Sequence, residues 1–144
     1  MNNLKLQADY IKKLIKGNTK TGYVTIDNKQ YITEGYAVYL LEPNFLNMDK
    51  THEYKIDMFD KEIPLLKNVE LQPTIDIYDK KELYNFINTE ENINLYADKK
   101  LFKYLDKLDD YKFKSVGNLK GIYCYKYEIL EAVILPVRYT KKGA

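Results

Sequence analysis

The sequence predicts a single domain of the α+β class, with two helices packed on antiparallel sheets, and three observations lead to this prediction. The chain has 144 residues, of which 45% are hydrophobic, and this suits one domain with one core. Residues 4–15 and 98–108 each repeat apolar side chains at helical spacing. Runs of β-branched and aromatic residues, separated by turn-forming residues, follow each segment and predict short strands.

The first expected element is an amphipathic helix over residues 4–15. Its apolar face consists of residues at three- and four-residue steps, namely Leu4, Ala8, Ile11, Leu14 and Ile15. Gly17 and Asn18 tolerate the left-handed conformation that ends many helices, so the helix is expected to end there.

Three antiparallel strands are expected directly after this helix. Residues 23–26 and 30–33 flank a turn at 27–29, which predicts a hairpin. A second turn, at residues 34–35, leads to a strand over 36–41 that is apolar enough to bury at least one face. The natural arrangement is a three-stranded meander.

Residues 42–75 show no regular element, because their charges alternate without a clear period and three prolines divide the segment. Beyond them, residues 79–87 predict a short extra helix, so residues 42–93 are expected as an irregular insertion that contains it. Asp79 is a suitable N-cap for this helix, and Glu82 stands at the third helical position.

The last third of the sequence repeats the order of the first. A strand at residues 93–96 precedes a helix that Asp98 caps. Three strands complete the chain, at residues 111–114, 121–127 and 131–139. Pro136 is expected at a strand end or an edge, because it cannot donate a backbone hydrogen bond.

The side chains that usually perform catalysis or bind metals are scarce. His52 is the only histidine and lies in a polar stretch, and Cys124 is the only cysteine, so a nucleophile with its base and a structural zinc site are both unexpected. No glycine-rich loop predicts nucleotide binding. The sequence predicts a protein that is not an enzyme and that uses no metal or small-molecule cofactor.

Two loose groups of acidic residues could in principle supply oxygen ligands to Mg²⁺. They are Asp57, Asp60 and Glu62, and Asp106, Asp109 and Asp110. Because 31% of the chain is charged, the favoured interpretation is an ordinary solvated surface.

The sequence also predicts a cytoplasmic protein without a membrane partner. Its beginning lacks the apolar stretch of a secretory signal. No apolar run approaches the roughly 20 residues that cross a bilayer, and the longest, at residues 129–137, is interrupted by Glu131.

Three parts of the chain resemble a domain of bacterial DNA sliding clamps. From Leu95 the sequence reads Leu-Tyr-Ala-Asp-Lys-Lys-Leu-Phe-Lys-Tyr-Leu-Asp-Lys-Leu, and residues 132–138 read Ala-Val-Ile-Leu-Pro-Val-Arg. Both are similar to the final segment of clamp subunits, which ends on Val-Met-Pro-Met-Arg. Residues 32–37 are similar to the Thr-Asp-Gly-His-Arg turn of clamps, whereas residues 42–93 are unmatched and would be an elaboration.

This resemblance implies a non-catalytic binding protein that acts in DNA replication or repair. In clamps, partner proteins insert a short apolar peptide into a pocket between two successive domains. The matching positions here are Thr33, Gly35, Tyr36, Leu135, Pro136, Val137 and Arg138. Since both halves of that pocket stand on one chain, a pocket of the family's kind implies a homo-oligomer with copies packed head to tail.

The resemblance further implies contact with duplex DNA through lysines on the outer faces of the two helices. These are Lys5, Lys12, Lys13, Lys16, Lys99, Lys100, Lys103 and Lys107. A lysine-rich protein also carries such residues on any surface helix. As an alternative, a solitary clamp domain encoded by a phage or mobile element would act as an interaction protein that inhibits a host replication or defence factor.

Overall fold

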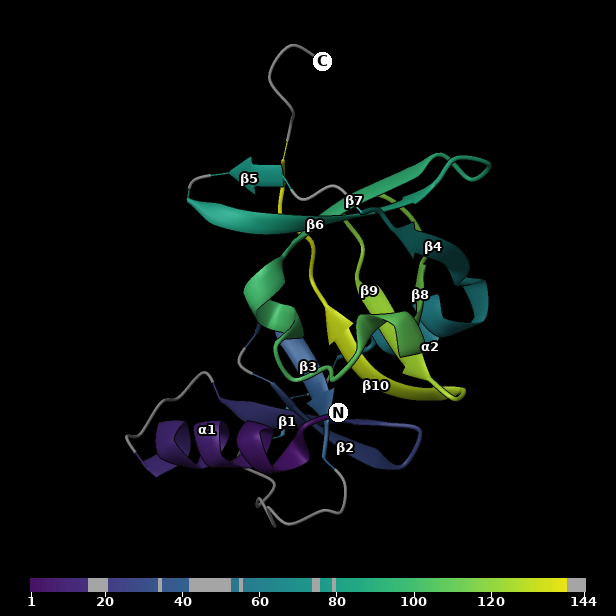
Figure 1. The fold of residues 1–144 in the computed structure, drawn as a ribbon. Coiled ribbons are helices and arrows are strands. Elements are labelled where there is room, and N and C mark those ends of the chain that lie inside the picture. The colour runs from purple at the N-terminus through teal and green to yellow at the C-terminus, as the bar shows by residue number, and fades with distance from the viewer. Residues whose placement is uncertain are drawn as a thin grey trace.

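The structure, a computed structural model, describes residues 1–15, 21–33, 35–41, 53–54, 56–73, 76–78 and 80–139. Within them the fold is α+β, as predicted: two α-helices accompany one large antiparallel sheet (Figure 1). The helices are α1 (Asn3–Ile15) and α2 (Met58–Glu62). The 3₁₀ turns are η2 (Ile63–Leu65), η3 (Lys99–Phe102) and η4 (Leu108–Asp110).

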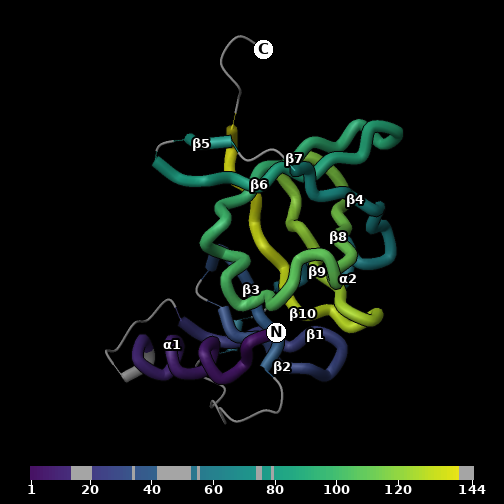
Figure 2. Tube along the Cα trace, in the orientation of Figure 1, coloured from purple at the N-terminus to yellow at the C-terminus, as the bar shows by residue number. Residues whose placement is uncertain are grey.

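Ten strands form the sheet in the order β1-β2-β3-β10-β9-β8-β4-β6-β5, and β7 pairs with β6. Their bounds are β1 Gly22–Ile26, β2 Lys29–Thr33, β3 Ala37–Leu40, β4 Lys67–Leu71, β5 Asp76–Tyr78, β6 Lys81–Asn88, β7 Ile93–Asp98, β8 Lys112–Ser115, β9 Ile122–Lys126 and β10 Ile129–Ile134. Strands β1 and β2 lie at one end of the molecule and β5 to β7 at the other (Figure 2).

The predicted meander after α1 is confirmed. Asp27 and Asn28 both have positive φ angles, 51° and 65°, so a two-residue turn joins β1 to β2. This backbone shape matches the right-handed twist of the two strands. Strand β3 then pairs with β2. The turn residues Asp27 and Asn28 therefore determine the position of the β1–β2 hairpin.

The second predicted meander is also confirmed, although its last strand ends earlier than expected. Tyr127 and Glu128 have φ angles of 49° and 66° and form the turn between β9 and β10. Strand β10 ends at Ile134, so Pro136 lies beyond its end, as expected. Strand β10 pairs with β3, with Val133 opposite Val38, and this pairing joins the two meanders into one sheet.

The helix predicted at residues 79–87 is wrong, because this segment contains strand β6. Leu83 and Phe86 are fully buried, and β6 pairs with β7 from Leu83 to Asn88 and with β4 and β5 on its other side. Apolar residues three positions apart, such as Leu83 and Phe86, fit one face of a helix or both faces of a buried strand. The segment forms a strand because it pairs with β4, β5 and β7. The expected N-cap, Asp79, lies outside the described residues. The short helix of the insertion is α2 instead.

The helix predicted after Asp98 is wrong in type. The Asp98 carboxylate does accept a hydrogen bond from the Lys100 amide at 3.0 Å, so the predicted cap is present. It opens only the 3₁₀ turn η3, and η4 follows separately. Phe102 and Leu105 are buried in this irregular path. The two halves of the chain therefore share their meanders but not their helices.

Helix α1 forms as predicted, but it buries a different face. Leu4 is 78% exposed and Ile11 is 38% exposed, whereas Leu6 and Tyr10 are buried. Tyr10 contacts the rings of Tyr39 and Tyr104, each at 6.4 Å between centroids. Tyrosine rings bury more apolar area than the expected aliphatic residues, so they set the orientation of the helix.

Strand β3 separates two hydrophobic clusters because alternate side chains point to opposite faces of a sheet. Tyr39 belongs to the cluster that includes Tyr10 of α1. Val38 belongs to the second cluster, which includes Phe59 of α2. The two helices therefore cover opposite faces of the sheet, and β3 is buried on both.

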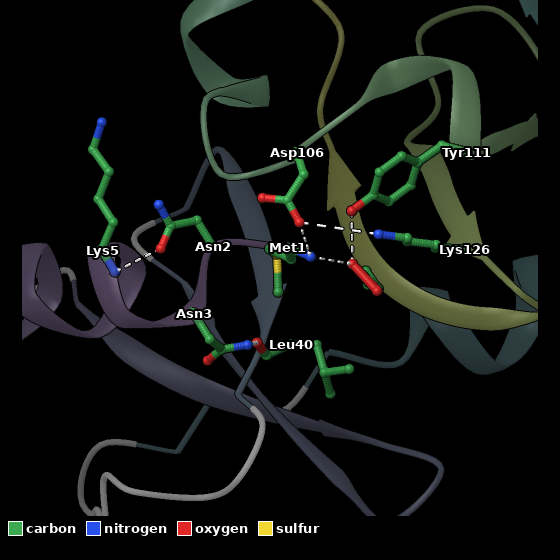
Figure 3. Close-up of polar contacts among 9 residues, drawn as sticks. Met1, Asn2, Asn3, Lys5, Leu40, Asp106, Tyr111 and Lys126 are labelled. Carbon is green, nitrogen blue, oxygen red and sulfur yellow. Dashed lines mark hydrogen bonds and ion pairs between the residues drawn. The ribbon is translucent and has the colours of Figure 1, made fainter.

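The α-ammonium of Met1 ties the start of α1 to the rest of the molecule (Figure 3). It lies 2.7 Å from a carboxylate oxygen of Asp106 and 3.4 Å from one of Glu131. The Tyr111 hydroxyl donates to Glu131 at 2.7 Å, and Lys126 Nζ lies 4.0 Å from Asp106 (Figure 3). The hydrogen bond from the ammonium group lowers the pKa of Asp106. This polar network links the start of the chain to Glu131 of β10 and to Asp106, which lies between η3 and η4.

Among the described residues, no helix has the length and apolarity needed to span a membrane.

Candidate functional site

An apolar cavity of about 460 Å³ opens between the β2–β3 turn, the segment leading into α2, and the end of β10. Thr33, Gly35 and Tyr36 line it from the turn, and Leu135 lines it from the chain after β10. Strands β3 and β10 supply further walls, and Tyr54, Ile56, Met58 and Phe59 supply the rest among the described residues. Four of the seven residues predicted to bind a partner thus meet in one cavity of a single chain.

The β2–β3 turn is held by hydrogen bonds of the Thr33 side chain to the backbone. Its hydroxyl donates to the Ala37 carbonyl at 2.6 Å and lies 3.1 Å from the Gly35 amide, which donates to it. Gly35 has a φ of +106°, a conformation that suits glycine and strains other residues. The Leu135 amide donates to the Tyr36 carbonyl at 3.0 Å, so the segment after β10 is fixed to the same turn.

The floor of the cavity is closely packed. Val38 and Val133 are buried register partners of β3 and β10. Phe59 of α2 is 4% exposed and packs edge-to-face on Tyr123, with centroids 6.2 Å apart. A Cβ added to Gly121 would stand 2.9 Å from a methyl of Val133, so this position needs glycine to keep the floor in place.

The rim, in contrast, is apolar and open to solvent. Tyr36 is 66% exposed, and Tyr54, Ile56 and Leu135 are between 36% and 39% exposed. Residues 53–54 are joined to the edge of β1, since the Tyr54 amide donates to the Tyr23 carbonyl at 2.7 Å. Exposed apolar side chains around a concave apolar floor are typical of a binding site.

No ionisable side chain other than the Tyr36 and Tyr54 phenols is among the described residues that line this cavity. Glu62 of α2 is buried and does not line the cavity, and it accepts a hydrogen bond from the Tyr123 hydroxyl at 3.4 Å. Burial, together with the charge of Glu62, raises the pKa of Tyr123. The Thr33 hydroxyl is already engaged by the turn. The cavity is therefore suited to apolar, uncharged groups.

The structure separates the other predicted partner-binding residues from the cavity. Pro136, Val137 and Arg138 do not line it. The Val137 amide instead donates to the Tyr96 carbonyl of β7 at 2.8 Å. Because Thr33, Gly35 and Tyr36 already meet Leu135 within one chain, no head-to-tail copy is needed to bring the two segments together.

Sequence reasoning missed the wall contributed by the insertion. Tyr54, Ile56, Met58 and Phe59 all line the cavity, yet they fall in the segment without a clear period. The sequence does hold a local signal, because three large apolar residues alternate with charged ones up to the start of α2. They are Tyr54, Ile56 and Met58. Only the pairing of residues 53–54 with β1 brings them to the turn.

The lysines predicted to contact DNA are distributed over α1 and the η3 segment. Lys5, Lys12, Lys99, Lys100, Lys103 and Lys107 are exposed, Lys13 is half-buried, and Lys16 lies outside the described residues. Lys13 and Lys103 stand over the rings of Tyr10 and Tyr104, at 4.6 and 5.0 Å. Lys103 also lies 4.0 Å from Asp9 of α1, so the two lysine groups adjoin each other.

Neither acidic group considered for Mg²⁺ forms a metal-binding cluster in the described part of the chain. Cys124 is fully buried in β9, and burial raises the pKa of its thiol. His52 lies outside the described residues.

Comparison of the chain with protein families, curated proteins and solved structures found no significant match.

Proposed function

We propose that this protein is a non-catalytic binding protein with a clamp-like domain, and that its apolar cavity takes side chains of an extended peptide from a partner protein. Such a contact would serve DNA replication or repair in the way that the sequence resemblance implies. The supporting observation is that Thr33, Gly35, Tyr36 and Leu135, predicted as partner-binding residues, line one cavity with an exposed apolar rim.

The chemistry of the rim favours a peptide over a charged ligand. Tyr36 and Tyr54 each offer an apolar ring with a polar hydroxyl, a combination that is common at protein interfaces. Burying two aliphatic side chains of a peptide in the cavity contributes about 3–6 kcal/mol before the cost of ordering the peptide. Because about 4 kcal/mol corresponds to millimolar binding, this contact alone gives a short peptide a dissociation constant no lower than about 40 μM.

Peptide selection from a random displayed library tests this proposal. Wild-type protein should select peptides with two or more large apolar residues. Their affinity should fall at least about tenfold for the double variant Ile56→Ser, Leu135→Ser, which removes two rim side chains. The matched control is Leu65→Ser, Ile77→Ser, since these residues are also a leucine and an isoleucine, are more exposed at 65% and 72%, and do not line the cavity.

Equal binding of the selected peptides to both double variants would contradict the proposal. Circular dichroism of each variant verifies that the fold is kept, which is expected because all four positions are exposed.

One observation favours the second candidate, an interaction protein that inhibits a replication or defence factor. The turn with Thr33 and Tyr36 meets Leu135 within one chain, so a solitary copy brings these two segments together without forming a ring. Primer extension by the replication proteins of the host distinguishes the two roles. Inhibition by wild type that is lost in the rim variant supports the inhibitor, whereas stimulation supports the clamp-like role.

A further inference from the structure

A second groove, of about 470 Å³, lies between the start of β6 and the η3 segment. Lys80 lines it from the β5–β6 turn and Lys81 from the start of β6, whereas Lys99, Lys100 and Lys103 line it from the other side. Tyr84 and Phe102 pack edge-to-face along it, with centroids 5.3 Å apart. Two chain segments that are distant in the sequence therefore bring five ammonium groups to one groove.

Each of the three carboxylates among the described lining residues binds another group of the protein. Asp98 accepts from the Lys100 amide at 3.0 Å, and Asp106 binds the Met1 ammonium at 2.7 Å. Glu82 binds Lys99 Nζ at 3.1 Å. Only Lys99 among the five lysines is used to neutralise a carboxylate of the groove.

The remaining ammonium groups have few partners within the described residues. No ion pair engages Lys80, Lys81 or Lys100 there, and Lys103 reaches Asp9 only at 4.0 Å. Among the described lining residues there are five lysines and three carboxylates. Positive charges therefore exceed negative ones in the described part of this groove, although the chain as a whole is nearly neutral.

We propose that this groove binds a run of consecutive phosphate groups, such as a nucleic-acid backbone or inorganic polyphosphate. Lysine ammonium groups bind phosphates as point charges and do not read base sequence. Several lysines spread along a groove suit a chain of phosphates better than a single one. The groove adds Lys80 and Lys81 to the lysines expected to meet DNA, and it shares no residue with the peptide cavity.

The test measures binding of three fluorescent or competing probes to the whole protein: a 30-base single strand, a 30-base-pair duplex and inorganic polyphosphate. The groove variant is Lys80→Gln, Lys81→Gln, Lys100→Gln, Lys103→Gln. It leaves Lys99 in place because that residue pairs with Glu82. The control variant is Lys61→Gln, Lys67→Gln, Lys112→Gln, Lys120→Gln, whose lysines are exposed and do not line the groove.

Both variants lose the same charge, so net charge cannot explain a difference between them. At about 0.1 M salt the groove variant should bind at least about tenfold more weakly than the control variant. The slope of log affinity against log salt concentration should also fall by roughly two for the groove variant.

The probes identify the source of the phosphates. Groove-dependent binding of either oligonucleotide assigns the groove to a nucleic-acid backbone, and groove-dependent binding of polyphosphate alone assigns it to a non-nucleic phosphate chain. The proposal is overturned if wild type binds none of the probes at low salt, or if the two variants bind them equally. Loss of peptide binding in the rim variant leaves this result unaffected, so the two proposals fail separately.

Discussion

At the scale of single residues, the cavity depends on the conformation of the β2–β3 turn. Thr33 was expected from the sequence to matter as part of a turn, and its hydroxyl does hold that turn through two hydrogen bonds. Gly35 supplies the conformation, with a φ of +106° and no atom within 4 Å of an added Cβ. The cost of replacing this glycine is therefore one of backbone strain, since no clash occurs.

Gly35→Ala should lower the free energy of unfolding by about 1–2 kcal/mol, because a non-glycine residue is strained at this φ. Urea denaturation measures the change. Gly117→Ala is the control, since an added Cβ there also meets no atom within 4 Å but its φ lies outside the strained range. Equal stability of the two variants would show that the turn relaxes without cost.

A second residue-scale prediction concerns Asp106, whose pKa is lowered by the hydrogen bond from the Met1 ammonium. A carboxyl group with a lowered pKa in the folded state stabilises the fold above its unfolded pKa. That stabilisation is lost as the pH falls through the folded pKa. Wild type should therefore be more stable than Asp106→Asn at about pH 6, and the difference should close below about pH 4.

Urea denaturation across this pH range measures the difference. Asp109→Asn provides the control, because Asp109 is exposed and makes no ion pair in the described part of the chain. Acetylation of the α-amino group of this chain should also lower stability at about pH 6, because it removes the contacts of the ammonium group with both Asp106 and Glu131. A difference that stays constant with pH would argue that Asp106 acts through packing alone.

At the scale of elements, the sequence predicts the parts whose signal is local. Asp27 with Asn28, and Tyr127 with Glu128, form turns that fix their hairpins without help from distant residues. Strand β6 was mistaken for a helix because its apolar spacing is ambiguous and its identity comes from β4, β5 and β7.

The β9–β10 hairpin allows a direct test of this local control. Glu128 has a φ of 66°, where glycine is favoured over a residue with a side chain. Glu128→Gly should therefore raise the free energy of unfolding by about 0.5–1 kcal/mol. Thr25→Gly, at an exposed position inside β1, should lower it by about 0.5–1 kcal/mol. Thermal melting of both variants checks the opposite signs.

At the scale of the whole molecule, the candidate site is produced by connections that no local pattern reveals. Sequence resemblance picked out the turn and the segment after β10, but it expected two copies of the chain to bring them together. The β3–β10 pairing does this within one chain, since Val133 stands opposite Val38. The wall from residues 54–59 depends on the bridge between Tyr23 and Glu53, which is equally long-range.

We expect the affinity for a peptide to be independent of the oligomeric state, because the cavity is lined by residues of a single chain. Each chain should bind one peptide with the same affinity from nanomolar to high micromolar protein concentration, because Leu135 and the turn meet within a single chain. Titration calorimetry gives the stoichiometry, and sedimentation at the same concentrations gives the oligomeric state. Affinity that rises only as oligomers form would show that a second copy completes the site.

Strand β3 also limits how the cavity can change during evolution. Val38 faces the cavity while its neighbour Tyr39 packs against Tyr10 and Tyr104 on the opposite side of the sheet. A substitution in β3 must preserve packing in the hydrophobic clusters on both faces of the sheet. Most substitutions there should therefore destabilise the fold and be selected against. The rim residues Tyr36, Tyr54 and Ile56 are substantially exposed and belong to neither core cluster. New partner preferences should therefore arise at the rim, while the floor stays the same across descendants of this chain.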